Sequence, residues 1–279
     1  MSIREDGVET VWTAAVASSN RVPIALSGGR VLVGSDNALH AFDLVTGAAL
    51  WPENLGSSDV VEVVPSDLGL VFVLTFDELR AVDEDSGETL WVRDLLLDLD
   101  GVADEAMDYG AGALFLGGDP LRKMDPSTGL VLAERQLGSS NLSALDERDG
   151  SIYVAGDEGV QALSSFDLEL VWTSPTTAYA DNVVVNSNTV FHSVLGEELV
   201  LLDRWSGGWL ASTAEGQVFE RLGAVGSRLL AGRSDGTLVA LTDGELDLLW
   251  EQPGDTPVRA IGGLAQSVFY AHGNNIDGL

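Results

Sequence analysis

The chain lacks cysteine, has only three histidines and contains no long apolar run. Without cysteine it cannot form a disulfide, a thiolate metal site, an iron–sulfur cluster or a cysteine nucleophile. No apolar run approaches the roughly 18 residues that a membrane-spanning helix needs. The first residues, Met1 to Asp6, contain no hydrophobic signal region. From these absences we expect a soluble, cytoplasmic protein that does not insert into a membrane.

Basic residues are also scarce, with 14 lysines and arginines against 44 aspartates and glutamates and a formal net charge of −30. Binding to nucleic acid is disfavoured, because phosphates need clustered lysine and arginine. Acids spread along the whole chain, with Lys123 as the single lysine, are typical of proteins from salt-loving archaea. Molar salt shortens the Debye length to roughly 3 Å and screens the repulsion between them. A surface built for a basic partner is the alternative interpretation.

Hydrophobic residues make up 45% of the 279 residues, which excludes a disordered acidic tail. The chain repeats itself about every 40 residues. Tryptophans that mark this period stand at Trp12, Trp51, Trp91, Trp172 and Trp250. The spacing continues from Trp250 through the joined chain ends to Trp12. A repeat of this length that closes on itself predicts a β-propeller rather than a solenoid.

An Ala-x-Asp-x-x-Thr/Ser-Gly-x-x-x-Trp motif recurs with this period; it is near-complete from Ala41 to Trp51 and from Ala81 to Trp91, and the other units keep only parts of it. Aspartate and threonine bond nearby backbone N–H groups in turns, and glycine accepts a positive φ. A tryptophan on the following strand can fill the gap between two sheets. We therefore predict that the motif is structural. Its members are Ala41, Asp43, Thr46, Gly47, Trp51, Ala81, Asp83, Ser86, Gly87, Trp91, Asp125, Gly129, Trp172, Asp203, Gly207, Trp250 and Trp12.

The repeat unit also divides into four short strands separated by turn residues. We predict an all-β fold, a seven-bladed β-propeller of four-stranded antiparallel blades that forms one domain over residues 1–279. The last unit, 258–279, lacks its fourth strand, and a strand over residues 8–13 is expected to complete it and close the ring. The first strands of the blades are expected at 23–26, 60–64, 102–107, 142–145, 182–185, 218–222 and 258–261.

The segment from Ala41 to Trp51 resembles the docking motif of the PQQ-like (quinoprotein-like) repeat propellers, and Ala81 to Trp91 resembles it with serine in place of threonine. The repeats are similar to those of quinoprotein alcohol dehydrogenases and of the lipoprotein that helps to assemble bacterial outer-membrane proteins. Those relatives usually have eight blades, whereas this chain has the length for seven. The dehydrogenases hold PQQ with calcium, a catalytic aspartate and often a disulfide of neighbouring cysteines. Since that disulfide is impossible here, we expect no cofactor.

Catalytic signatures are missing from the sequence. His40, His192 and His272 fall on predicted second or third strands or their turn, and none is on a first strand at the channel. There is no His-Glu-x-x-His motif, no phosphate-binding glycine loop and no Gly-x-Ser-x-Gly motif. We therefore expect no catalytic residue and no metal site.

Two groups of residues are candidate binding sites. The first surrounds the expected channel mouth and could bind an anion or an acidic tail, unless its arginines pair with neighbouring acids such as Glu220 or Asp255. The second lies in the loop from Trp91 to Asp108, together with the leucines at 95–97. It could bind a cation or dock a basic partner, or its leucines could pack onto the blade. The channel-mouth group is Asn20, Arg21, Asp59, Asn141, Asn182, Arg221 and Arg259, and the loop group is Asp94, Asp98, Asp100 and Asp104.

The function expected from these features is that of a non-catalytic protein-interaction scaffold or assembly subunit adapted to high salt. Its partner would be another protein. The alternative is a small-ligand-binding protein or quinoprotein-type enzyme that uses the mouth of the central channel.

Overall fold

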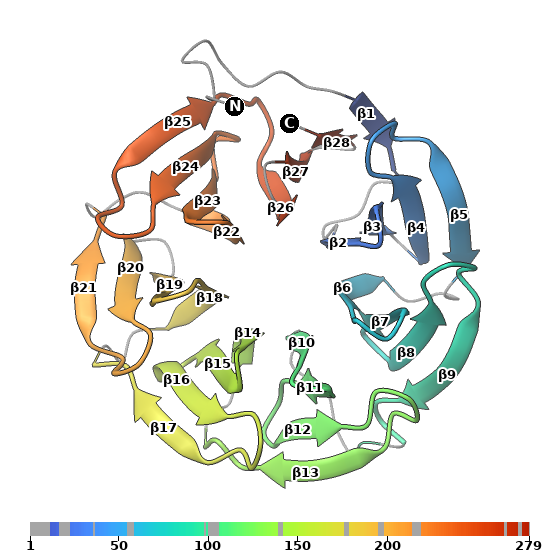
Figure 1. Cartoon of the computed structure of the whole chain (residues 1–279), viewed down its shortest axis with the longest axis horizontal. Coiled ribbons are helices and arrows are strands. Elements are labelled where there is room, and N and C mark those ends of the chain that lie inside the picture. Colours follow the sequence, from blue (N-terminus) through green and yellow to red (C-terminus); the bar gives the residue numbers. More distant parts are fainter. Residues whose placement is uncertain are drawn as a thin grey trace.

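The computed structural model describes residues 12–16, 23–35, 37–54, 59–97, 99, 106–138, 142–175, 179–194, 198–213, 219–264, 267–272 and 275–278. The described strands form seven four-stranded antiparallel sheets, arranged as blades around a central axis (Figure 1). Six of these blades are each built from one continuous segment of the chain, and the seventh combines strands from both ends. Within the described residues, no helix is long and apolar enough to span a membrane.

The strands of each blade follow one another from the channel to the outside (Figure 1). In that order the blades are β2 (Ile24–Ser27), β3 (Arg30–Ser35), β4 (Ala38–Asp43) and β5 (Ala49–Asn54); β6 (Val60–Pro65), β7 (Leu70–Thr75), β8 (Glu78–Asp83) and β9 (Thr89–Asp94); β10 (Met107–Gly110), β11 (Ala113–Leu116), β12 (Leu121–Met124) and β13 (Val131–Arg135); β14 (Leu142–Arg148), β15 (Ser151–Gly156), β16 (Gly159–Ser164) and β17 (Leu170–Thr173); β18 (Ala180–Val185), β19 (Thr189–Val194), β20 (Glu198–Asp203) and β21 (Trp209–Ser212); β22 (Phe219–Val225), β23 (Arg228–Arg233), β24 (Leu238–Thr242) and β25 (Leu248–Gln252); and β26 (Val258–Leu264), β27 (Ser267–His272), β28 (Asn275–Gly278) and β1 (Trp12–Ala15).

The composite blade closes the ring, because β1 pairs antiparallel with β28 from Trp12↔Gly278 to Ala15↔Asn275. The strand was expected over 8–13, and its described part, β1, runs from Trp12 to Ala15, two residues further; residues 8–11 lie outside the described residues. The reason is packing. Trp12 and Ala14 lie against the buried Phe269 and Ile276, so the strand extends past residue 13.

The first strand of the third blade also differs from the prediction. We expected it at 102–107, whereas β10 runs from Met107 to Gly110. Met107 pairs with Leu116, and the β10–β11 turn places Ala111 and Gly112 at positive φ. The pairing of β10 with β11 therefore places the strand at Met107–Gly110, closer to the turn than the expected 102–107.

The tryptophans of the repeat motif join neighbouring blades. Trp172 on β17 lies against Gly207 in the next blade's turn, where an added Cβ would come within 2.5 Å of the indole ring. Its Nε1 donates a hydrogen bond to the carbonyl oxygen of Arg204 (2.9 Å). Glycine is therefore required at that position both by the close approach and by its φ of +69°. The same Trp–Gly contact joins Trp12 to Gly47, Trp51 to Gly87 and Trp91 to Gly129.

Two junctions between blades have a different pair of residues at these positions. Leu168 and Leu246 stand where the motif has glycine, with φ of +62° and +60°. Ala133 and Ala211 stand where the preceding blade has tryptophan, and each alanine packs in the same apolar cluster as the leucine it faces. The space at each of these junctions is thus filled from the turn instead of from the outer strand.

Candidate functional site

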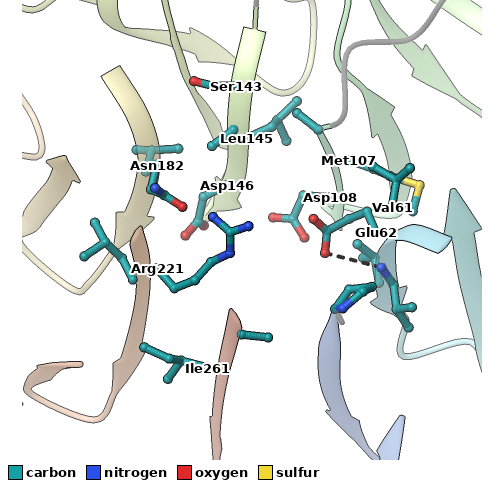
Figure 2. Close-up of a pocket in the computed structure, with 18 of the residues that line it drawn as sticks. Val61, Glu62, Met107, Asp108, Ser143, Leu145, Asp146, Asn182, Arg221 and Ile261 are labelled. Carbon is teal, nitrogen blue, oxygen red and sulfur yellow. Dashed lines mark hydrogen bonds between the residues drawn. The ribbon is translucent and has the colours of Figure 1, made fainter. Parts of the chain in front are cut away.

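The first strands of all seven blades surround a central cavity of about 900 Å³. Its lining is mixed: apolar side chains such as Met107, Leu145 and Ile261 alternate with polar ones such as Asp146 and Arg221 (Figure 2). Because every blade contributes to this cavity, the channel is the place where side chains from distant parts of the chain come together.

Two partly buried aspartates link neighbouring blades at the channel. Asp108 on β10 accepts hydrogen bonds from the backbone N–H of Tyr109 (2.8 Å) and from that of Glu147 in the next blade (2.5 Å). Asp146 on β14 accepts one from the N–H of Val185 in the blade after that (2.8 Å). The two carboxylates therefore connect three successive blades through backbone amides.

The charge state of these acids follows from their surroundings. Burial raises the pKa of Asp108 well above its usual range, and repulsion from Asp146 adds to this effect. Burial likewise raises the pKa of Asp146 to about 7 and that of Glu147 in the same direction. Burial in this part of the channel therefore shifts all three carboxyl groups toward the protonated form. In the described part of the chain, no three histidine, aspartate or glutamate side chains gather to hold a metal ion.

The predicted channel-mouth residues are brought together only in part. Asn182 on β18, Arg221 on β22 and Arg259 on β26 line the cavity, whereas Asp59 precedes β6 and does not. Arg221 donates to the backbone carbonyl of Arg259 through Nε (2.8 Å) and to that of Glu220 through Nη1 (2.6 Å), and it extends into the channel (Figure 2). Asn20, Arg21 and Asn141 lie outside the described residues.

The acidic loop after β9 is described only at its beginning. The Asp94 carboxylate accepts hydrogen bonds from the N–H groups of Leu96 (2.9 Å) and Leu97 (2.8 Å), and so forms a local turn. Leu95 is buried, but Leu96 and Leu97 are exposed, so only one of the three leucines packs onto the blade. Asp98, Asp100 and Asp104 lie outside the described residues.

None of the three histidines is among the residues that line the channel cavity. His192 on β19 is fully buried between Val183 and Val200 of the neighbouring strands, and neither ring nitrogen has a hydrogen-bond partner. Burial lowers its pKa to about 4 and also lowers that of His40. His272 is the last residue of β27, not part of a turn as expected, and its Nδ1 lies 3.3 Å from Thr256 Oγ1.

A second candidate site lies on the outside of the propeller. The outermost strands are open sheet edges, and three consecutive blades carry a dense set of exposed, large apolar side chains there. We call this set the three-blade rim. It is composed of Leu130, Val131, Leu132, Phe166, Leu170, Val171, Trp205, Trp209 and Leu210.

Neighbouring parts of the three-blade rim are in contact. Lys123 in the first of these blades donates to the carbonyl oxygen of Phe166 in the second (3.0 Å). Trp172, next to Val171 on β17, contacts the 203–207 turn of the third blade through its bond to Arg204. The rim therefore continues from β13 across the turn of the second blade to β17, the 203–207 turn and β21, on one side of the ring (Figure 1).

The exposed Trp205 rests on a fixed support. The buried Arg204 guanidinium lies 4.8 Å from the Trp205 ring centroid. Arg204 donates to the Tyr153 hydroxyl (3.0 Å), to Asp149 (3.0 Å) and to the carbonyl oxygen of Arg148 (2.8 Å) in the preceding blade. These bonds hold the guanidinium under the indole, so Trp205 is presented on a rigid base.

The sequence contains a signal for the rim that the predicted binding sites do not include. An apolar residue directly precedes the tryptophan position of the repeat, and in the structure it is exposed in each of the six continuous blades. Neighbouring residues of a strand point to opposite faces of the sheet. The residue before the docked tryptophan therefore points away from the junction that the tryptophan fills. These residues are Leu50, Leu90, Leu132, Val171, Leu210 and Leu249.

The chain is similar to one family model and to solved propeller structures. The family model, described as outer membrane protein assembly factor BamB and of the PQQ-like type, matches residues 3–106 and 75–204. No curated protein matches the chain. Among solved structures, the computationally designed Ika8 protein is similar with a TM-score of 0.71 at 14% identity, over 95% of this chain and 98% of that chain. BamB from Moraxella catarrhalis is similar with a TM-score of 0.65 at 18% identity, over 95% and 84%.

These structural likenesses show the propeller fold, and the family model covers well over half of the sequence. The docking motif agrees with it at the residue level, since each Trp–Gly contact uses the motif positions that resemble the PQQ-like repeat. The chain therefore belongs to the PQQ-like repeat family whose model describes the assembly factor BamB.

Proposed function

We propose that this chain is a non-catalytic scaffold that binds a protein partner through the three-blade rim, in a cytoplasm of high salt concentration. One observation carries the proposal. Five of the seven tryptophans are wholly or partly buried, whereas Trp205 and Trp209 are 63% and 56% exposed. Exposed tryptophan on a rigid base is typical of the residues that dominate binding energy in protein interfaces.

The hydrogen bonds of the channel residues support a structural rather than a catalytic role for the channel. Asp108 uses both carboxylate oxygens to accept backbone N–H groups, and Arg221 is bonded to backbone carbonyl oxygens. These residues do not fit a calcium-bound quinone of the kind held by the quinoprotein dehydrogenases. Calcium needs ionised carboxylates with oxygens to offer, and burial at Asp108 and Asp146 favours the neutral form.

Membership in the PQQ-like family is consistent with a scaffold. The matching family model is described as an outer membrane protein assembly factor, a description that names assembly and no reaction. The acidic surface adds a requirement for salt, because 44 acids on one chain repel one another at low ionic strength.

Site-specific photo-crosslinking tests the proposal. A photoreactive residue replaces Leu210, which is 47% exposed on the rim, or Leu90, which is 53% exposed at the matching position of the second blade. Both variants are exposed to a lysate of the source organism at molar salt. We expect a crosslinked protein of defined mass from position 210 and not from position 90. Equal crosslinking from both positions, or none from either, would overturn the proposal.

A further inference from the structure

We infer that the partner's binding element is an extended segment with apolar side chains at alternate positions and with lysine or arginine at its flanks, and that it pairs as an added strand with the open edge of β21. This inference rests on the proposed function, since it names the partner class for the three-blade rim. Three features of the rim carry it: an open edge, two aromatic anchors and a border of ionised acids.

The open edge is given by the topology. β21 is the outermost strand of its sheet and pairs on its inner side with β20, Leu201 facing Ala211 and Val200 facing Ser212. Thr213 donates its N–H inward to the carbonyl oxygen of Leu199 (3.0 Å). Because N–H directions alternate along a strand, the N–H of Ser212 points outward. An extended chain can therefore add to this edge by backbone hydrogen bonds.

The aromatic anchors flank this edge at its beginning. Trp209 is the first residue of β21, and Trp205 lies in the turn that leads into it. Leu210, the next residue of β21, is also apolar and exposed. A segment lying along β21 would place every second side chain toward this surface, so alternate apolar residues fit it better than a continuous polar chain.

The border of the rim is negative. The Ser206 hydroxyl holds the pKa of Asp203 below its usual range, and the Ser164 hydroxyl does the same for the pKa of Asp167. Both acids therefore stay ionised in the turns that lead into β17 and β21. At the β13 side, Lys123 and Arg135 are already bonded to Phe166 and Glu169. Flanking lysines or arginines on the partner would complement this border.

The alternatives are less well supported. A second copy of this chain has 14 basic residues against 44 acidic ones, so it offers few lysines or arginines to complement this border. A folded partner that uses only its side chains would leave the open edge of β21 without backbone partners.

Defined peptides test the inference by fluorescence anisotropy on the full chain. The main probe is a labelled peptide of alternating valine and threonine with a lysine pair at each end. One control has the same side chains but N-methylated alternate amides, which cannot donate to a strand edge. The other has glutamate pairs in place of the lysines. We expect the main probe to bind roughly tenfold or more tightly than either control, and its affinity to fall from physiological to molar salt.

Two variants of the protein locate the binding on β21. Ser212→Pro removes the outward N–H and should weaken the probe roughly tenfold, whereas Ser212→Ala should leave its affinity unchanged. Thermal melting monitors the fold of both variants. If Ser212→Pro fails to fold, the N-methylated control decides the question alone. Equal binding of the N-methylated peptide, or of the glutamate-flanked one, would overturn the inference.

The two proposals can fail separately. If position 210 crosslinks a partner while no peptide binds, the partner docks on the rim by another surface, and only this inference is overturned. If the lysine-flanked peptide binds while nothing crosslinks from position 210 in the lysate, the scaffold function through the rim is overturned, and the edge remains an intrinsic peptide-binding feature.

Discussion

Six of the seven junctions between blades are of two kinds, and each kind fills the same space in its own way. At four junctions a tryptophan from one blade's outer strand lies on a glycine in the next blade's turn, as Trp172 lies on Gly207. At two others an alanine faces a leucine that the turn holds at positive φ, as Ala133 faces Leu168. Neighbouring blades therefore pack together in both cases, although the large residue changes sides.

The two kinds of junction separate the tryptophans that build the fold from those that do not. The junction after β21 is filled by Leu246 packed near Ala211, so Trp209 is not needed there and is exposed. Trp205 lies in the turn that Trp172 contacts, but its own side chain is 63% exposed. Two large aromatic side chains thus remain on the surface of a blade whose packing is already complete, and this is why we assign them to a partner.

The largest expected effect comes from removing a docked tryptophan. Trp172→Ala should lower the free energy of unfolding by about 3–5 kcal/mol, because it empties a buried junction. Trp209→Ala should change it by no more than about 0.5 kcal/mol, because the side chain is exposed. Urea unfolding at molar salt measures both. A loss at Trp209 as large as that at Trp172 would mean that the exposed tryptophan also supports the fold.

The next test converts one kind of junction into the other. Ala133→Trp alone should overfill the junction and cost about 1–3 kcal/mol. Leu168→Gly alone should leave a cavity and cost about 2–4 kcal/mol. The double variant should recover about 1–3 kcal/mol relative to the sum of the single changes. Strictly additive losses in the double-mutant cycle would contradict the idea that the two residues fill one space.

A third test concerns His192, which stands where the matching strands have Val33, Val73 and Val154. Burial lowers its folded-state pKa to about 4, below the ordinary value of 6.5. Stability should therefore be lost as pH falls from about 6.5 toward 4, since the unfolded chain takes up the proton first. His192→Val should remove this loss and gain about 2 kcal/mol at pH 5 relative to pH 7.5. Parallel pH profiles for the two proteins would refute this reasoning.

The channel acids should produce the opposite pH dependence. Burial raises the folded-state pKa of Asp146 to about 7. The favourable contribution of its protonated form to folding stability is therefore present at acid pH and is lost as pH rises from about 4 through 7. Asp146→Asn keeps an oxygen that can accept the Val185 N–H and carries no charge. We expect the free energy of unfolding of this variant to exceed that of the parent chain above pH 7, and the difference to be smaller near pH 5. Urea unfolding measures both. An equal difference at both values would contradict this assignment.

The smallest expected effect is that of salt on the unmodified chain. Molar salt should raise the free energy of unfolding by about 1 kcal/mol, or the melting temperature by about 2–4 °C, because it screens repulsion between exposed acids. Scanning calorimetry from low to molar sodium chloride measures this change. A melting temperature that does not move would favour the alternative that the acids serve a basic partner.

The repeat period, the motif and the four-strand unit could be read from the sequence because each depends on local chemistry. Asp43, Thr46 and Gly47 form one turn within a few residues, and such turns leave a clear pattern. The start of β10 was misplaced because a hairpin's register depends on its partner strand. Asp108 and Asp146 could not be distinguished from surface acids, since their burial and their bonds to the next blade arise only when the ring closes.

The central claim is that Trp205 and Trp209 bind a partner without supporting the fold, and the double variant Trp205→Ser/Trp209→Ser tests it most directly. Urea unfolding and crosslinking from position 210 are measured on the same protein. We expect a free energy of unfolding within about 1 kcal/mol of the parent chain, together with loss of the crosslinked partner. Retention of the partner at the parent yield, or destabilisation comparable to that of Trp172→Ala, would contradict the claim.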